Sequence, residues 1–100
     1  MIRWAMIKSY RGKYAEVIHT QRKVPKGFPA DIANIARRKL VMLNGAQKLE
    51  DLKSLPGNRL EELKGDLKGK HSIRINDKWR ILFKWTEQGP EEVDIVDYHD

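Results

Sequence analysis

The C-terminal part of the chain carries the side chains best suited to moving protons. His99 has an imidazole, whose pKa of about 6.5 lets it take up and release protons at neutral pH. In an extended segment, Asp97 lies two residues earlier on the same side, where its carboxylate could orient the ring or keep it charged. The spacing therefore predicts a proton-transfer pair, and a solvated tail residue is the competing interpretation of His99.

Arg80 is the residue best suited to binding a phosphate group. Its neighbours Trp79 and Ile81 should occupy the apolar face of a strand, so Arg80 should point to the other face together with Lys84. The planar guanidinium group offers paired donors that match phosphate oxygens. The competing interpretation is a solvated strand face with ordinary charges.

A second arginine, Arg74, should lie on the neighbouring strand and face the same way as Arg80. Two guanidinium groups on one face repel each other unless an anion or a carboxylate joins them. Asp94 and Asp97 are the candidate carboxylates. The two arginines therefore indicate either an anion site or internal ion pairs with those aspartates.

Antiparallel strands should position these residues. Apolar and polar residues alternate over residues 71–75 and 79–85, and the turn residues 76–78 between them predict a hairpin. Residues 88–90 predict the next turn, and residues 93–98 predict the last strand.

Helices should precede this sheet. Apolar residues recur at helical spacing between Pro29, which favours a first turn, and Gly45, which favours a stop. Residues 49–55 predict one or two further turns, residues 13–21 a short helix and, weakly, residues 2–9 a strand. Two helices followed by three or four antiparallel strands predict an α+β fold, with the helices packed on one face of the sheet.

Length and composition restrict the class of protein. One hundred residues suit a single domain over residues 1–100, in which residues 1–5 could be an N-terminal extension because Met6 is itself a possible start. The formal charge is +6, and the first fifty residues hold eleven basic and three acidic side chains. Such a basic chain is expected to bind an anionic partner.

No apolar run approaches the roughly 18 residues of a membrane helix. The lack of cysteine is compatible with a reducing cytoplasm.

A basic run, Arg37-Arg38-Lys39, lies in the later turns of the predicted central helix. The functional interpretation is contact with ribosomal RNA, whose affinity should fall steeply with salt. The competing interpretation is a solvated helix face.

No metal or cofactor is expected. Asp94 and Asp97 are three residues apart and should point to opposite faces of a strand, so they lack the spacing of metal ligands. The chain contains neither a glycine-rich phosphate loop nor a nucleophile elbow. We interpret His19 and His71 as structural.

Several short motifs together resemble one known family, the HigB-like toxins of the RelE superfamily. The resemblance runs from about Met6 to the end of the chain and is strongest in the second half. The segments that carry it are Pro56-Gly57-Asn58-Arg59-Leu60-Glu61, Leu63-Lys64-Gly65, His71-Ser72-Ile73-Arg74-Ile75, Trp79-Arg80-Ile81 and Asp97-Tyr98-His99.

The resemblance implies a RelE-like microbial RNase fold and the activity of a type II toxin. Such a toxin is a cytoplasmic, ribosome-dependent endoribonuclease that cuts messenger RNA without a metal and so inhibits translation. It also implies a HigA-like antitoxin with a helix-turn-helix domain, through which the pair contacts promoter DNA. On this reading, the cations that bind RNA are Arg74, Lys84, Arg37, Arg38 and Lys39.

The resemblance also assigns catalytic roles. It implies that Lys64 stabilises charge at the cleavage site and that Arg80, Asp97 and His99 act with it. Tyr98 would stack on a base or donate a hydrogen bond to the RNA backbone, and a buried strand tyrosine is the alternative.

Glu61 departs from the family pattern, because some relatives carry a histidine three residues before this lysine. A glutamate could act as a base, but its charge should weaken phosphate binding unless Arg59 or Lys64 pairs with it. A mild toxin is consistent with this residue. The two alternatives to an enzyme are a non-catalytic RNA-binding module and a corepressor that only binds the antitoxin.

Overall fold

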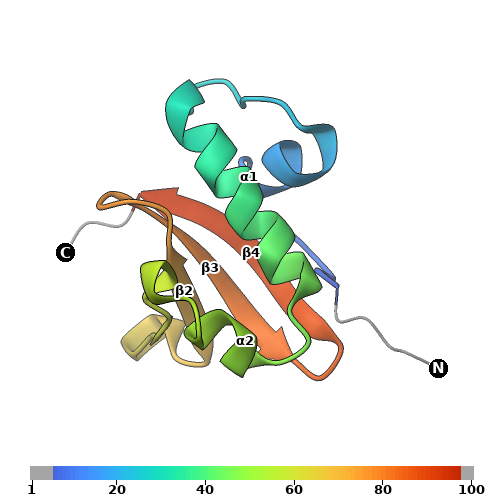
Figure 1. The fold of residues 1–100 in the computed structure, drawn as a ribbon, viewed down its shortest axis with the longest axis vertical. Coiled ribbons are helices and arrows are strands. Elements are labelled where there is room, and N and C mark those ends of the chain that lie inside the picture. The colour runs from blue at the N-terminus through green and yellow to red at the C-terminus, as the bar shows by residue number, and fades with distance from the viewer. Residues whose placement is uncertain (1–5, 98–100) are drawn as a thin grey trace.

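A computed structural model of the chain describes residues 6–97 and shows a four-stranded sheet with helices on one face (Figure 1). The strands are β1 (Glu61–Glu62), β2 (Lys70–Arg74), β3 (Trp79–Thr86) and β4 (Gly89–Asp97); they lie in that order, and each neighbouring pair is antiparallel. The helices are η1 (Val17–Gln21), α1 (Ala30–Gly45) and α2 (Leu49–Lys53), with 3₁₀ turns η2 (Pro56–Asn58) and η3 (Gly65–Leu67). The predicted α+β fold is confirmed.

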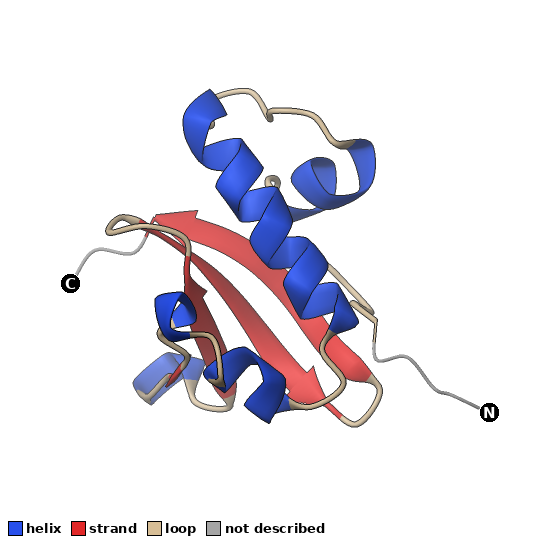
Figure 2. Ribbon diagram, viewed as in Figure 1, coloured by secondary structure: helices blue, strands red, loops and turns tan. Residues whose placement is uncertain are grey.

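α1 is the main helix, and it lies across the sheet (Figure 2). It begins directly after Pro29 and ends at Gly45, as the sequence predicts. Its fully buried side chains recur every three or four residues, which is the spacing of one helix face. They are Ala33, Ala36, Leu40 and Leu43.

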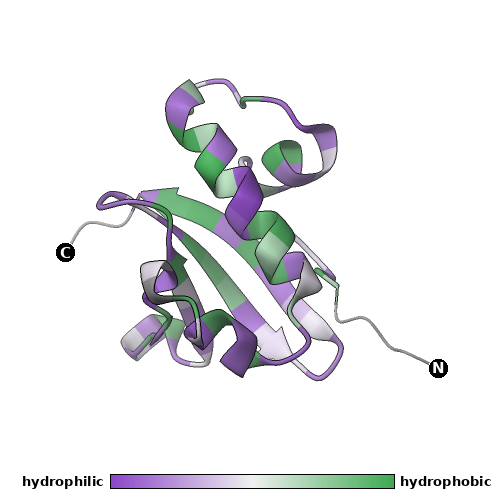
Figure 3. Cartoon of the chain, in the orientation of Figure 1, coloured by the Kyte–Doolittle hydropathy of each residue, from purple (hydrophilic) through white to green (hydrophobic). Residues whose placement is uncertain are grey.

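The strands alternate between a core face and an outer face. Ile73, Ile81 and Ile95 lie opposite one another on β2, β3 and β4, and all three are buried in the core with the apolar face of α1. In Figure 3, hydrophobic segments in green run along β3, β4 and α1 and are interrupted by hydrophilic residues in purple. Residues one position away along each strand must therefore point to the outer face.

The predicted β2–β3 hairpin is confirmed, and Asn76 holds its turn. The Asn76 side-chain oxygen accepts hydrogen bonds from the backbone N–H groups of Lys78 at 2.9 Å and Trp79 at 2.7 Å. Asparagine favours such turns because its short side chain can replace backbone hydrogen-bond partners. The turn therefore fixes the register in which β3 returns along β2.

The predicted N-terminal strand differs from what is observed. Residues 6–9 have no regular structure, and Tyr10 makes only an isolated parallel bridge to Val93 of β4. The backbone carbonyl of Ser9 also accepts a hydrogen bond from the Val93 N–H at 3.0 Å. The segment thus follows the β4 edge without forming a ladder.

Gly12 lets the chain pass close to β4. Its φ of 77° lies in the left-handed region, and a Cβ at this position would collide with the Asp94 carboxylate. The backbone N–H of the preceding residue, Arg11, donates to the Val93 carbonyl at 2.9 Å, so the contact with β4 extends to this point. Burial raises the pKa of Asp94 against the opposing effect of a backbone hydrogen bond at Ile95.

An aromatic cluster closes one end of the core. The Phe28 and Trp79 ring centroids are 4.7 Å apart, and Tyr14 lies 5.1 Å from Phe28 and 5.9 Å from Trp79. The cluster anchors the long link between η1 and α1 on the start of β3. Trp79 is therefore a core residue and does not form a base-stacking platform.

Asn58 joins three elements beneath the sheet. It is fully buried, and its side-chain oxygen accepts a hydrogen bond from Lys39 Nζ of α1 at 2.6 Å. Its Nδ2 donates to the Leu52 carbonyl of α2 at 3.1 Å and contacts Met42 Sδ at 3.2 Å. These bonds fix the position from which the chain enters β1.

We predict that Asn58→Ala lowers the free energy of unfolding by about 1–3 kcal/mol, because it leaves buried polar partners without their hydrogen bonds. Urea denaturation measures the loss. Asn34→Ala is the matched control, since the exposed Asn34 accepts a hydrogen bond from Arg37 on the helix surface, and its effect should stay within about 0.5 kcal/mol. Equal effects of the two substitutions would contradict the role of Asn58.

Candidate active site

The outer face of the sheet holds the residues that the sequence proposes for phosphate binding. Directly opposed residues share a face, so the register defines two rows there. One row contains Glu61, Ser72, Leu82 and Asp94, and the next contains Arg74, Arg80 and Val96.

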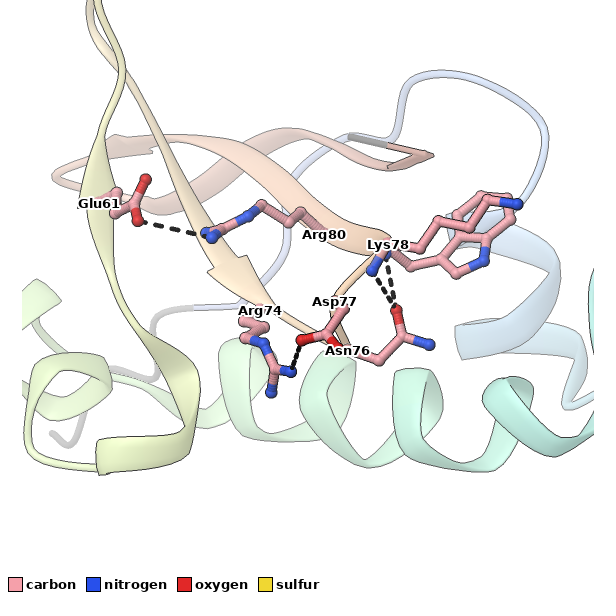
Figure 4. A network of polar contacts seen from close by, with 7 residues as sticks. Glu61, Arg74, Asn76, Asp77, Lys78 and Arg80 are labelled. Carbon is pink, nitrogen blue, oxygen red and sulfur yellow. Dashed lines mark hydrogen bonds and ion pairs between the residues drawn. The ribbon is translucent and has the colours of Figure 1, made fainter. Parts of the chain in front are cut away.

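Arg80 of β3 contacts one residue of β2 and one of β1. Its Nη1 donates to Ser72 Oγ at 3.2 Å, and its Nη2 lies 3.5 Å from Glu61 Oε1 (Figure 4). The Arg80 side chain is 15% exposed, whereas that of Glu61 is 51% exposed. The guanidinium group is therefore ordered and poorly solvated, and such a group attracts an anion more strongly than one in open water.

Two buried leucines lie outside the main core of the protein. Leu63 and Leu82 are buried, but neither belongs to the main core cluster on the other side of the sheet. Leu82 lies directly opposite the fully buried Ser72. Leu82 also lies two residues after Arg80 on β3, so the register places both side chains on the same face of the sheet.

The two arginines do not share one anion. Arg74 forms an ion pair with Asp77 of the hairpin turn, and Figure 4 shows its side chain extending toward α1, whereas Arg80 points toward Glu61. The sequence left Asp94 and Asp97 open as carboxylate partners of either arginine, and the carboxylate that pairs with Arg74 is that of Asp77. The i,i+3 spacing of Arg74 and Asp77 across the turn was the missed signal.

Asp97 lies opposite Trp79, so the register places it on the face away from the Arg80 row. Its carboxylate lies 3.5 Å from Lys78 Nζ. Asp94 faces the Leu82 row, so the predicted divergence of the two aspartates is confirmed. The predicted residues Tyr98 and His99 lie outside the described residues.

The other predicted cations are spread around the fold. Lys64 is exposed at the start of η3, three residues after Glu61, and Lys84 is exposed on β3 between Lys70 and Glu91. On α1, Arg37 donates to Asn34 at 3.1 Å, whereas Arg38 is exposed. Lys39 instead donates to the buried Asn58. One residue of the basic run therefore has a structural contact with the interior of the protein.

The two described histidines lie away from Arg80. Burial lowers the pKa of His19, whose Nδ1 is hydrogen-bonded to the Tyr10 hydroxyl. Burial, and then the nearby Glu16, raise the pKa of Tyr10. His71 stacks on Phe83 with ring centroids 6.0 Å apart.

Ser72 is the functional residue that sequence reasoning missed. A serine within an alternating strand reads as an ordinary outward residue, and nothing in its type indicates a partner 8 positions away. The signal was present in the register, because pairing Arg74 with Arg80 necessarily places Ser72 opposite Leu82.

Within residues 6–97, no group of three or more histidine or carboxylate side chains is placed to hold a metal ion. None of the helices in that range is long and apolar enough to cross a membrane.

Comparison with known proteins identifies the relatives of this chain. A family profile described as a RelE-like toxin of type II toxin-antitoxin system HigB matches residues 8–99. Toxin HigB-1 of Vibrio cholerae serotype O1 is 39% identical over 82 residues, which cover 82% of this chain and 86% of that protein. Endoribonuclease HigB of Proteus vulgaris is 29% identical over 94 residues, which cover 94% of this chain and all of that protein.

The profile covers the helices, the sheet and every residue that contacts Arg80 in the described part of the fold. The resemblance seen in the sequence motifs and the α+β architecture point the same way. The chain belongs to the RelE-like HigB family of toxins of type II toxin–antitoxin systems.

Proposed function

We propose that this protein is an endoribonuclease that cuts messenger RNA in the ribosome and is neutralised by an antitoxin. The observation that carries the proposal is the Arg80 guanidinium, held by Ser72 on the sheet face away from the helices. Family membership supports a toxin, and the name of the Proteus vulgaris relative supports RNA cleavage.

Cleavage of an RNA phosphodiester requires three events. The 2′-hydroxyl loses its proton as its oxygen attacks phosphorus, the negative charge on the phosphoryl oxygens is neutralised, and the bond from phosphorus to the 5′-oxygen breaks as that oxygen gains a proton. Side chains supply all three in the mechanism proposed, so we assign no metal or cofactor to it.

Each predicted residue has a place in this mechanism. Arg80 and Lys64 stabilise the charge on the phosphate, and a fixed donor of this kind contributes about 10²–10³-fold in rate. His99 transfers protons at neutral pH. Asp97 orients the ring or keeps it charged, and because Asp97 faces away from the Arg80 row, this role requires the residues after Asp97 to bring the imidazole to the phosphate. Tyr98 stacks on a base of the RNA or donates a hydrogen bond to its backbone.

The partners follow from the same proposal. The ribosome positions the messenger RNA, which replaces much of the binding energy that a 100-residue protein lacks. The proposed antitoxin is HigA-like, with a helix-turn-helix domain that contacts promoter DNA on behalf of the pair. The site of action is then the cytoplasm, where translating ribosomes are found.

A corepressor without nuclease activity is the second candidate, and Glu61 favours it. Its carboxylate lies 3.5 Å from Arg80 Nη2, in the position that a phosphate oxygen would need. On the enzyme proposal, substrate must displace this carboxylate, which predicts a toxin of reduced activity.

Arg80→Ala should lower ribosome-dependent cleavage by about 100-fold or more, because it removes the phosphate ligand. Primer extension on a defined messenger RNA in purified translating ribosomes measures the cuts. The variant should still fold and bind the antitoxin. Undiminished cuts would contradict the role of Arg80, and no cuts from folded wild-type protein would leave the corepressor.

Glu61→Gln should raise the cleavage rate about two- to fivefold, since a half-exposed ion pair that competes with phosphate is worth roughly 0.5–1 kcal/mol. Glu62→Gln is the matched control, because Glu62 lies opposite His71 and belongs to the other side of the strand. The same primer-extension assay compares the two variants. A fall in rate for Glu61→Gln would instead identify Glu61 as a base.

Ser72→Ala should loosen Arg80 without unfolding the protein. We expect about 1 kcal/mol lower stability, a lower NMR order parameter for the Arg80 Nε–H group and several-fold slower cleavage. Ser54→Ala is the control, since the exposed Ser54 hydroxyl donates only to the Asp51 carbonyl within its own turn. An unchanged Arg80 order parameter would refute positioning by Ser72.

A further inference from the structure

A hollow of about 330 Å³ opens beside the link between η1 and α1, and it is called the link hollow below. In Figure 1, η1 and this link lie beside the first half of α1, at the end of that helix away from α2. Its wall residue Tyr14 packs on Trp79, which belongs to the core. The link hollow is therefore on the helix side of the sheet, whereas the Arg80 side chain points to the outer face.

Contacts with the core fix the walls of the link hollow. The Tyr14 ring centroid lies 5.1 Å from that of the buried Phe28. Pro25 also lines the hollow, is buried, and accepts a hydrogen bond at its carbonyl from the Phe28 N–H at 3.0 Å. The hollow is thus formed before any partner arrives, which lowers the entropy cost of binding there.

Val24 gives the link hollow an exposed apolar surface. Its side chain is 50% exposed, and it lines the hollow together with Val17, Tyr14 and Pro25. A single exposed apolar side chain on a convex surface is ordinary, but Val24 lies at a concave site with three further residues of low polarity. Burial of Val24 by an aliphatic side chain of a partner would be favourable.

The polar part of the lining is basic. It consists of Lys13, Lys23 and Lys26. In the described part of the chain none of these lysines lies in an ion pair with a carboxylate. Glu16 is the only acidic residue among residues 11–28, and it is not part of the lining. Three cations around an apolar hollow complement a partner that carries carboxylates on either side of an apolar side chain.

The two other possible occupants fit the link hollow less well. An RNA base needs an exposed aromatic face on which to stack, whereas the Tyr14 ring contacts Phe28, Trp79 and the Lys13 ammonium group, which lies 5.4 Å from its centroid. A second copy of this chain carries the same net charge of +6, so it would be repelled. An acidic segment of a partner protein matches both the apolar and the basic parts.

We propose that the link hollow binds an acidic segment of the antitoxin. One aliphatic side chain of that segment packs against Val24, and carboxylates beside it pair with the three lysines. This inference rests on the proposed function for the identity of the partner. The apolar contact supplies most of the affinity, and the ion pairs accelerate association and fix the orientation of the segment.

The apolar contact is tested with two exposed valines. Val24→Ser should weaken binding of the full-length protein to its antitoxin about five- to twentyfold, because it removes apolar surface at the contact. Val41→Ser is the matched control, since Val41 is 58% exposed on α1 and does not line the link hollow; its effect should be less than about twofold. Isothermal titration calorimetry measures both affinities, and both variants should fold because the side chains are at the surface.

The charge contact is tested with two exposed lysines. Lys23→Gln should slow association with the antitoxin about two- to fivefold at low salt and make the association rate less dependent on salt. Lys53→Gln changes the net charge equally, but Lys53 lies on α2, outside the link hollow, so its effect should be smaller than about 1.5-fold. Stopped-flow fluorescence over a series of salt concentrations measures the rates.

The outcomes separate this inference from the proposed nuclease. Undiminished antitoxin binding by Val24→Ser, or equal losses in Val24→Ser and Val41→Ser, would overturn the link hollow and leave the cleavage assay unaffected. A wild-type protein that binds no antitoxin would overturn both proposals. Co-sedimentation with small ribosomal subunits tests the RNA alternative: a loss in Val24→Ser and Lys23→Gln that is confined to the subunits would assign the hollow to RNA and refute the antitoxin.

Discussion

The register of β2 on β3 is the constraint on which the rest of the structure depends. Pairing Ile73 with Ile81 buries both under α1, and the same pairing sets Ser72 within reach of the Arg80 side chain on the other face. A slip of one residue would move the isoleucines to the outer face and drive the arginine into the core. Core packing and phosphate binding are therefore fixed by a single choice of register, and the Asn76 turn enforces it.

Electrostatics on the outer face follow from that register. Arg80 is poorly exposed, and its contacts include a neutral acceptor, Ser72, and a competing carboxylate, Glu61. The serine holds the guanidinium without cancelling its charge, whereas the glutamate partly cancels it. Because an ion pair with a half-exposed carboxylate is weak, an RNA phosphate, whose single negative charge is shared by two oxygens, can replace Glu61 when a ribosome positions it. The same residue would thus limit activity without abolishing the site.

Much of the fold could be predicted from the sequence because its strongest signals are local. Helical spacing placed α1 between Pro29 and Gly45, and alternation with an Asn-Asp turn placed the hairpin and the outward direction of Arg80. The residue types did not reveal what depends on contacts between distant segments. The bond of Ser72 to Arg80, the bonds of Asn58 to two helices and the single bridge of the N-terminal segment all require the assembled fold.

The distribution of ion pairs determines which basic residues of the protein keep their positive charge unbalanced. In the described part of the chain, several cations of the sheet have nearby carboxylates, as Arg80 has Glu61 and Lys70 has Glu92 at 3.6 Å. The basic residues of α1 have no such pairs there, since Arg37 and Lys39 bond to asparagines. A neutral asparagine orders a basic side chain without cancelling its charge, so these residues keep their attraction for an anion. Ser72 acts on Arg80 in the same way, because its hydroxyl accepts a hydrogen bond and leaves the positive charge in place.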